Sequence, residues 1–206
     1  MSGNTIFWDV DTQADFLLAG GKLYVPGAEK IIPNLRRLVD AAREGRIFLV
    51  SDVDSHTLED EEFQHWPPHC LRGTPGQLKV PETMTESFYP IPNHTDARLP
   101  ANLRKFRQVI LEKQTLDVFD NPNTEIVLER LRQAYEPEKP EFVVFGVVTE
   151  YCVRLAAAGL LKRGRRVAIV TDAIETLNAA EGKRALEELA AKGARLITTD
   201  QALARL

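Results

Sequence analysis

Short apolar runs alternate with amphipathic stretches along most of the chain, and this alternation restricts the fold more than any other feature. The apolar runs, each bounded by polar residues, are residues 5–10, 46–53, 108–112, 142–148, 166–171 and 195–198. Amphipathic helices are indicated at residues 28–44, 124–134, 153–163 and 179–192. This pattern predicts a three-layer α/β fold, in which a mostly parallel, six-stranded sheet carries helices on both faces.

One stretch breaks the alternation. Residues 57–100 are rich in proline, glycine, threonine and charged residues, and they show little periodicity. A long irregular segment inside a compact domain is usually functional or disordered. The sequence contains no internal repeat, low-complexity segment or linker, so we expect residues 1–206 to form a single domain.

Composition and charge limit the function classes. With 44% hydrophobic and 27% charged residues, the chain has the balance of an ordinary globular protein. A formal charge of −4 gives no reason to expect a nucleic-acid partner. The sequence shows no secretory signal, no apolar run of membrane-spanning length, and two cysteines, too few for a disulfide framework. We therefore expect a cytoplasmic protein that binds neither nucleic acid nor a membrane.

The run from Phe142 to Cys152 indicates a buried strand, a turn and the start of a helix. Its first residues are mostly apolar and β-branched or aromatic, as in an interior strand of a parallel sheet. Thr149 is a suitable N-cap, which places Cys152 in the first turn of the helix. Unpaired N–H groups there favour a thiolate and can hold an anion that develops on a substrate carbonyl. A small buried cysteine without chemical function fits this segment equally well.

Three residues with chemically active side chains follow three different predicted strands. Asp11 follows the first strand, Lys113 the third, and Cys152 the fourth. In an open α/β sheet the carboxyl ends of the strands lie at one edge, so these side chains can form a nucleophilic site. The lysine would lower the pKa of the thiol, and the carboxylate could carry its proton. Taken singly, the aspartate also fits a helix cap and the lysine a solvated surface.

A second group of residues suggests a metal site. Asp54 and His56 are two residues apart on an extended segment, so both side chains point the same way, and Glu62 and His69 follow. Imidazole and carboxylate ligands suit a divalent transition metal such as zinc, iron or manganese. Loop histidines with unrelated acids remain the alternative interpretation.

Three motifs, taken in order, resemble one protein family. Asp11-Thr-Gln-Ala-Asp-Phe16 is similar to the Asp-x-Gln-Asn-Asp-Phe opening of isochorismatase-like cysteine hydrolases, with Ala14 in place of the usual asparagine. Asp54-x-His56 with Trp66-Pro-Pro-His-Cys-x-x-Gly-Thr-Pro-Gly76 resembles the metal-binding stretch of the nicotinamidase/pyrazinamidase branch. Gly146-Val-Val-Thr-Glu-Tyr-Cys-Val153 resembles the nucleophile loop. The resemblance covers most of the chain and implies the isochorismatase-like, Rossmann-like fold.

The resemblance also implies roles for individual residues. It makes Cys152 the nucleophile, Asp11 the proton-transfer carboxylate and Lys113 the cation that stabilises the thiolate. The oxyanion hole would use the backbone N–H groups of Val148 and Cys152, with a cis peptide between Val147 and Val148. Cys70 fills a cysteine position that the family does not use as nucleophile.

The metal and the substrate follow from the same resemblance. Metal ligands map to Asp54, His56 and His69, with Glu62 as a fourth ligand and Glu61 and His65 as its rivals. The residues expected to contact the substrate are aromatic. They are Phe16 and Trp66, which match ring-pocket positions, and Tyr151, a bulky residue expected to shape the pocket entrance.

The implied activity is cleavage of nicotinamide, or a similar small aromatic amide, to the acid and ammonia through a thioester. In that branch the metal holds the pyridine nitrogen of the substrate. Residues 113–121 differ from the Gly-rich, Tyr-containing stretch usual there, so another small amide, a carbamoyl compound or an isochorismate-like vinyl ether stays open. A non-catalytic binding protein is a further alternative. We also expect a homo-oligomer.

Overall fold

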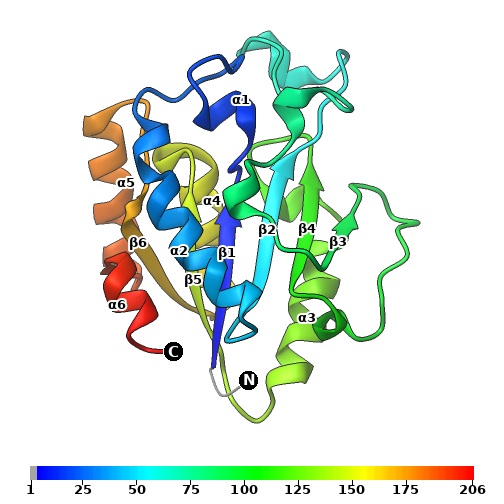
Figure 1. Ribbon diagram of the computed structural model, residues 1–206, viewed down its shortest axis with the longest axis vertical. Coiled ribbons are helices and arrows are strands. Elements are labelled where there is room, and N and C mark those ends of the chain that lie inside the picture. The colour runs from blue at the N-terminus through cyan, green and yellow to red at the C-terminus, as the bar shows by residue number, and fades with distance from the viewer. Residues whose placement is uncertain (1–3) are drawn as a thin grey trace.

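The computed structural model describes residues 4–206, and a seven-stranded sheet forms its centre (Figure 1). All neighbouring strands are parallel, in the order β3-β4-β2-β1-β5-β6-β7. The strands are β1 (Thr5–Val10), β2 (Phe48–Asp54), β3 (Phe88–Ile91), β4 (Gln108–Lys113), β5 (Glu141–Gly146), β6 (Arg166–Ile174) and β7 (Arg195–Ile197). The predicted parallel α/β architecture is confirmed. The single-domain prediction for residues 1–206 stays a prediction, and residues 1–3 lie outside the described residues.

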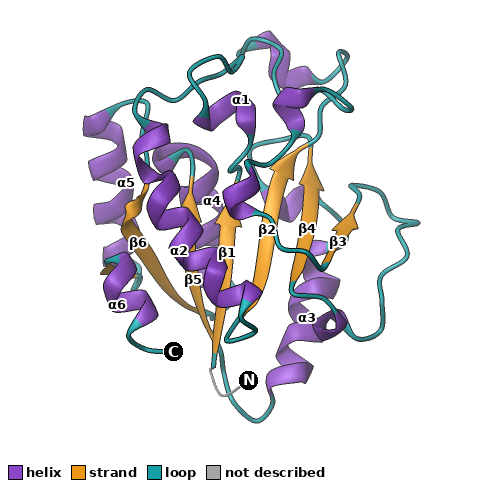
Figure 2. Ribbon diagram, viewed as in Figure 1, coloured by secondary structure: helices purple, strands orange, loops and turns teal. Residues whose placement is uncertain are grey.

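Helices cover both faces of the sheet (Figure 2). On one face lie α2 (Ile32–Arg43) and α6 (Thr199–Leu203), and on the other lie α3 (Thr124–Tyr135), α4 (Arg154–Lys162) and α5 (Ala179–Ala191). The short α1 (Ala14–Leu17) follows β1, and the 3₁₀ turn η1 (Ala28–Ile31) leads into α2. Within the part of the chain that the structure describes, no helix has the length and apolar character needed to cross a bilayer.

The two faces of the sheet are buried in separate apolar clusters. Phe7 and Leu49 belong to the cluster under α2, whereas Trp8 and Val50 belong to the cluster under α3 and α4. Neighbouring residues of a strand point to opposite faces, so a strand covered on both faces must be apolar at nearly every position. This requirement explains why the central strands appear in the sequence as short continuous apolar runs.

The predicted number of six strands is wrong, because β3 forms a seventh strand at the edge of the sheet. It lies within residues 57–100, has four residues, and exposes Phe88 and Pro90. Proline donates no ladder hydrogen bond and is confined to sheet edges, so the sequence of β3 lacks the signal of an interior strand. The rest of this segment contains the 3₁₀ turns η2 (Glu61–Gln64), η3 (Pro75–Gln77) and η4 (Pro81–Thr83).

The segment after β5 begins with a π-helical turn, η7 (Thr149–Val153), which continues into α4. The peptide between Val147 and Val148 is cis, as predicted. The N-cap prediction for Thr149 is wrong: Val148 occupies that position, and the Thr149 hydroxyl donates to the carbonyl oxygen of Glu175 at 2.7 Å. Cys152 lies within η7, two residues before α4 begins, so its predicted position near a helix start is confirmed.

Candidate active site and metal centre

Four adjacent strands of the sheet bring the predicted site residues together at their carboxyl ends. Asp54 ends β2, Lys113 ends β4, Asp11 follows β1, and Cys152 lies in η7 after β5. The strands β4, β2, β1 and β5 are consecutive in the sheet. All four side chains are buried, with residue exposures of 6% or less. The chain reverses its direction of winding at β1, and in open α/β sheets ligands bind at such a point.

Lys113 joins the predicted catalytic residues to the predicted metal ligands. Its Nζ lies 2.9 Å from Asp11 Oδ2 and 3.7 Å from Cys152 Sγ, and it forms a short ion pair with Asp54 Oδ1. The buried ammonium is thus surrounded by two carboxylates and the thiol. The structure therefore places Asp11, Lys113 and Cys152 in one contact group.

The backbone around this group has two unusual conformations. Asp11 has a φ of +48°, and its N–H donates to the carbonyl oxygen of Asp52 at 3.1 Å. Gly146 has a φ of +120°, and a Cβ at this position would lie 2.0 Å from the carbonyl oxygen of Val10. Only glycine fits so close an approach, so Gly146 lets β5 pass close to the end of β1 just where the nucleophile loop begins.

The turn that holds Cys152 is closed through Val148. The carbonyl oxygen of Val148 accepts the N–H groups of Tyr151 at 3.0 Å and of Val153 at 3.2 Å, on either side of Cys152. This arrangement fixes Val148 and the nucleophile candidate in one compact turn. The assignment of Val148 and Cys152 N–H groups to an oxyanion hole stays a prediction.

Burial controls the protonation of the reactive group. It is the largest cause that raises the pKa of Cys152 above its ordinary value, and Lys113 opposes this effect only in part. Burial and the charge of Asp54 likewise raise the pKa of Asp11. The predicted effect of Lys113, which is to lower the pKa of the thiol, is therefore present, but burial outweighs it. A neutral thiol beside a carboxylate of raised pKa is suited to pass its proton to that carboxylate during attack.

The ammonium of Lys113 remains charged although it is buried. Burial alone would lower its pKa, but the carboxylates of Asp11 and Asp54 and the sulfur of Cys152 raise it well above its ordinary value. For Asp54 burial again acts in the opposite direction, but the charge of Lys113 holds the pKa of this carboxyl below its usual range. The site therefore contains a fixed cation beside an ionised carboxylate.

Asp54, His56, Glu62 and His69 form a compact group of donor atoms, all within 4.8 Å of one another. Asp54 Oδ2 lies 3.6 Å from His56 Nε2 and 3.4 Å from His69 Nε2. Glu62 Oε1 lies 3.9 Å and 3.7 Å from the same two nitrogens. Both Nε2 atoms are buried and have no hydrogen-bond partner within residues 4–206.

The geometry of these donors fits a divalent ion. Donor atoms bound to one ion at about 2.1 Å lie roughly 3–4 Å from one another, close to the distances found here. His69 Nδ1 lies 2.8 Å from the carbonyl oxygen of Pro67, and His56 Nδ1 lies 2.9 Å from Asp60 Oδ2. Because these oxygens accept hydrogen bonds, Nδ1 carries the hydrogen and Nε2 presents its lone pair to the group. The rival ligands Glu61 and His65 lie outside the group and line an adjoining pocket.

The loop that supplies His69 and Glu62 folds back along the end of β2. His56 N–H donates to the carbonyl oxygen of Cys70 at 3.1 Å, and Arg72 N–H donates to that of His56 at 3.0 Å. These two bonds place His69 beside His56. Asp60 is the N-cap residue of η2, and its carboxylate accepts from Thr57 N–H and faces His56. These contacts position Glu62, two residues later.

Two residues that support the site are given no role by the sequence, although one of them, Gln13, belongs to the Asp11–Phe16 motif. Gln13 is fully buried, and its amide accepts from Asp54 N–H and donates to Asp54 O, both at 2.8 Å. It also donates to the carbonyl oxygen of Gln77 at 2.8 Å. Asp60 is the second such residue, through its contact with His56. Spacing could have identified Asp60, which lies four residues after His56, but a buried amide that holds a backbone leaves no periodic pattern.

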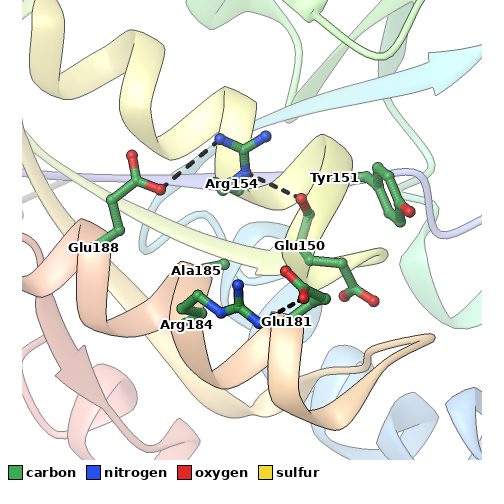
Figure 3. A pocket seen from close by; sticks show the side chains of 7 residues that line it. All are labelled: Glu150, Tyr151, Arg154, Glu181, Arg184, Ala185 and Glu188. Atoms are coloured by element: carbon green, nitrogen blue, oxygen red, sulfur yellow. Dashed lines mark hydrogen bonds and ion pairs between the residues drawn. The ribbon is translucent and has the colours of Figure 1, made fainter.

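The aromatic residues occupy different positions around the site. Phe16 is buried, with its ring 5.3 Å from that of His69, and Trp66 lies edge-on to Tyr151 at 5.3 Å between ring centroids. Trp66 lines the pocket beside the metal-ligand group. Tyr151 lines a separate groove of about 590 Å³ between η7, α4 and α5. Figure 3 shows this groove, with ion pairs between Arg154 and Glu188 and between Arg184 and Glu181.

Cys70, the other cysteine, lies outside the contact group formed by Asp11, Lys113 and Cys152. Its side chain is buried, and burial, followed by the charges of Asp54 and Asp11, raises the pKa of its thiol. Its N–H donates to Asp15 Oδ2 at 2.7 Å, which fixes the loop rather than exposing the sulfur. This environment supports the interpretation of Cys70 as a structural residue.

The chain is similar to known proteins along most of its length. The family model described as "Isochorismatase domain" matches residues 6–201. A nicotinamidase from Escherichia coli is 28% identical over 204 residues, covering 92% of both chains. A nicotinamidase/pyrazinamidase from Mycobacterium tuberculosis is 25% identical over 197 residues, covering 91% of this chain and 95% of the relative.

A solved structure of a related amide hydrolase has a similar fold. The pyrazinamidase of Pyrococcus horikoshii in complex with zinc superposes with a TM-score of 0.74 at 27% identity, covering 95% of this chain and 99% of the other. The named relatives are amide hydrolases. The sheet topology, the three motifs in order and the family match over nearly the whole length show that the chain belongs to the isochorismatase family of hydrolases.

Proposed function

We propose that this chain is a metal-containing cysteine amidohydrolase that cleaves nicotinamide, or a similar small aromatic amide, to the acid and ammonia. The observation that carries this proposal is the position of Lys113 Nζ. It lies 2.9 Å from Asp11 and 3.7 Å from Cys152 Sγ, and it pairs with Asp54 of the metal-ligand group. One buried cation thus joins a nucleophile and its proton acceptor to the residues that could hold an ion.

The first half of the reaction forms a thioester. Cys152 Sγ attacks the amide carbonyl carbon while Asp11 takes the thiol proton, and Lys113 stabilises the negative charge that passes from sulfur to the carbonyl oxygen. The N–H groups of Val148 and Cys152 are the proposed donors to that oxygen. When the tetrahedral intermediate collapses, the C–N bond breaks and Asp11 gives its proton to the leaving ammonia.

The second half hydrolyses the thioester. Water attacks the acyl carbon, Asp11 takes its proton, the C–S bond breaks, and the proton returns to the Cys152 sulfur. The product is the carboxylic acid. The raised pKa of Asp11, caused by burial and by Asp54, suits a carboxyl group that must accept and give a proton in each half-reaction.

The proposed metal ligands are Asp54, His56, Glu62 and His69. When bound there, the ion supplies a Lewis-acid position that a pyridine nitrogen can occupy, which orients the substrate ring. The zinc complex of the related pyrazinamidase supports zinc as the first metal to test, with iron and manganese as alternatives. Phe16, Trp66 and Tyr151 are the proposed aromatic contacts around the ring.

The segment after Lys113 favours a second candidate within the same chemistry. Gln114, Thr115 and Leu116 line the pocket beside Glu62 and Trp66, so the part of the sequence that departs from the usual pattern borders the proposed substrate pocket. Hydrolysis of a different small amide or carbamoyl compound is the alternative that this observation supports.

An ammonia-release assay tests the proposal. Purified protein with one equivalent of zinc should release ammonia from nicotinamide and pyrazinamide, and Cys152→Ala should not. Benzamide, which lacks the ring nitrogen, should react at least tenfold more slowly. Equal rates for benzamide and nicotinamide would contradict the orienting role of the ion, and activity only on an aliphatic or carbamoyl amide would replace the substrate assignment.

A further inference from the structure

A pocket of about 630 Å³ adjoins the candidate active site. Glu62 belongs both to this pocket and to the metal-ligand group. Gln114, which follows Lys113, and Leu155, which lies three residues after Cys152, also line it. The pocket is therefore the opening through which a small substrate can approach the buried group.

Apart from His65, the ionisable side chains that line this opening are all carboxylates. Its carboxylates are Asp60, Glu61, Glu62, Asp117 and Asp120. Among the described residues, no lysine or arginine lines it. Asp60, Glu61 and Glu62 come from the η2 segment, and Asp117 and Asp120 from the segment after β4, so the acids border the opening from two separate parts of the chain.

Local contacts hold these carboxylates at the opening. Asp120 Oδ2 accepts the Thr115 hydroxyl at 2.7 Å, and Asp117 Oδ1 accepts the Phe119 N–H at 2.9 Å. Neither contact supplies a balancing positive charge. A divalent ion in the metal-ligand group would offset only part of the five negative charges, and Lys113 already pairs with Asp11 and Asp54.

We propose that this opening selects substrates by charge: it admits neutral and cationic amides and excludes anionic ones, and Glu61 and Asp120 are specificity-determining residues. This inference rests on the proposed amidohydrolase function. A concave surface of one sign concentrates ligands of the opposite sign and repels those of the same sign, and dissolved salt weakens both effects. The same field repels the carboxylate product after hydrolysis.

Three nicotinamides that differ only at ring position 5 test the inference. The 5-aminomethyl compound is a cation near pH 7.5, the 5-hydroxymethyl compound is neutral, and the 5-carboxy compound is an anion. All three keep the amide and the ring nitrogen. At low ionic strength we expect kcat/KM for the cation to exceed that for the anion at least thirtyfold, with the neutral compound between them.

Matched variants identify the residues responsible. Glu61→Gln combined with Asp120→Asn removes two charges from the opening, and the cation-to-anion ratio should fall at least fivefold with little change for the neutral compound. Glu187→Gln combined with Asp96→Asn removes two charges from exposed positions outside the opening and should leave the ratio unchanged. Adding 0.5 M salt shortens the Debye length to roughly 4 Å. For the wild type, this salt should lower the cation-to-anion ratio as the Glu61→Gln, Asp120→Asn double variant does.

The outcomes separate this inference from the function on which it rests. If neither nicotinamide nor the neutral 5-hydroxymethyl compound is hydrolysed, the proposed function fails and the inference fails with it. Hydrolysis of the neutral compound with similar kcat/KM for cation and anion overturns the inference alone. A ratio that falls equally in both double variants overturns the assignment to Glu61 and Asp120.

Discussion

At the scale of single residues, the candidate site depends on charges that are buried together. Lys113 is 1% exposed, as are Asp11 and Asp54, and its ammonium contacts both carboxylates. A buried charge without a partner is strongly destabilising, so removal of one member of such a group affects the others. The residues that perform the proposed chemistry are therefore also part of the electrostatic balance of the core.

The two cysteines provide the first test at this scale. Cys152→Ala should lower kcat by at least about 1,000-fold, as expected for loss of a nucleophile, whereas Cys70→Ala should retain most activity. In the wild type, iodoacetamide should modify Cys152 before Cys70, because Cys70 has no exposed surface and only Cys152 contacts Lys113. Mass spectrometry of the labelled peptides measures this order. Equal labelling of both thiols, or an active Cys152→Ala variant, would contradict the assignment.

Gln13 provides the second test. Gln13→Met keeps the volume of the side chain but leaves the N–H and C=O of Asp54 without the hydrogen bonds that Gln13 supplies. We expect the wild type to hold about one zinc ion per chain, and the variant to bind zinc about 10–100-fold more weakly, as is typical for loss of a group that supports a ligand. Competition with a chromogenic chelator measures the affinity.

The control for Gln13 is Gln133→Met, a change on α3 at an exposed position. It should leave zinc affinity unchanged. A Gln13→Met variant that is folded by circular dichroism and binds zinc as the wild type does would show that Asp54 needs no such support.

At the scale of elements, the turn between β5 and η7 decides where the nucleophile lies. Gly146 ends β5, the cis peptide follows, and Val147 N–H donates to the carbonyl oxygen of Val10 at 3.0 Å. The sequence predicts this strand from its apolar run, but it extends the strand to Val148, two residues past the observed end at Gly146. It does not predict the π-helical form of η7.

Gly146→Ala tests the demand for glycine in this turn. The new Cβ would lie 2.0 Å from the carbonyl oxygen of Val10, at a φ of +120°. We expect a loss of about 3 kcal/mol or more in the free energy of unfolding. Gly164→Ala is the matched control, since its φ is +67° and its Cβ would meet nothing within 4 Å. Gly164→Ala should lower the free energy of unfolding by about 1 kcal/mol. Urea denaturation under the same conditions measures both variants. Equal losses in the two variants would contradict the steric argument.

The edge strand β3 shows the limit of periodicity as a signal for strands. β3 has four residues, contains Pro90 and lies at the edge of the sheet, so it needs no apolar run and gives no strand signal. The interior strands are all predicted because burial on two faces requires such runs. The same limit applies to Glu62: spacing left Glu61 and His65 as rivals, and only the folding of η2 against His56 separates them.

At the scale of the whole molecule, several acidic side chains lie inside the core. Asp9 and Asp52 are buried on opposite faces of the sheet, Asp9 paired with Lys79 Nζ at 2.5 Å and Asp52 accepting from Trp8 Nε1 at 2.6 Å. Burial, the largest cause, raises the pKa of Asp52 to about 7 from an ordinary value of 3.8. The folded chain therefore keeps a proton on Asp52 that the unfolded chain loses above about pH 4.

Asp52→Asn tests this consequence in chelator-treated protein. Between about pH 4 and pH 7 the ordinary carboxyl ionises only in the unfolded chain, so Asp52 opposes folding more and more as the pH rises, and fully above pH 7. Asparagine keeps the acceptor for Trp8 and has no charge to lose. Relative to the wild type, the variant should therefore gain on the order of 3 kcal/mol in unfolding free energy from pH 5 to pH 8. Urea denaturation measures the difference in unfolding free energy between the variant and the wild type. A difference that stays the same from pH 5 to pH 8 would contradict the raised pKa of Asp52.

The position of β1 has a consequence for the chain during its synthesis. β1 is near the beginning of the sequence but lies in the middle of the sheet, where Ile6 pairs with Phe48 on one side and with Phe142 on the other. A ribosome-bound chain can pair β1 with β2 early, but the other edge of β1 stays open until β5 has emerged. Such an open, apolar edge is a template for aggregation, so the nascent chain is most exposed to misassembly before its nucleophile loop is made.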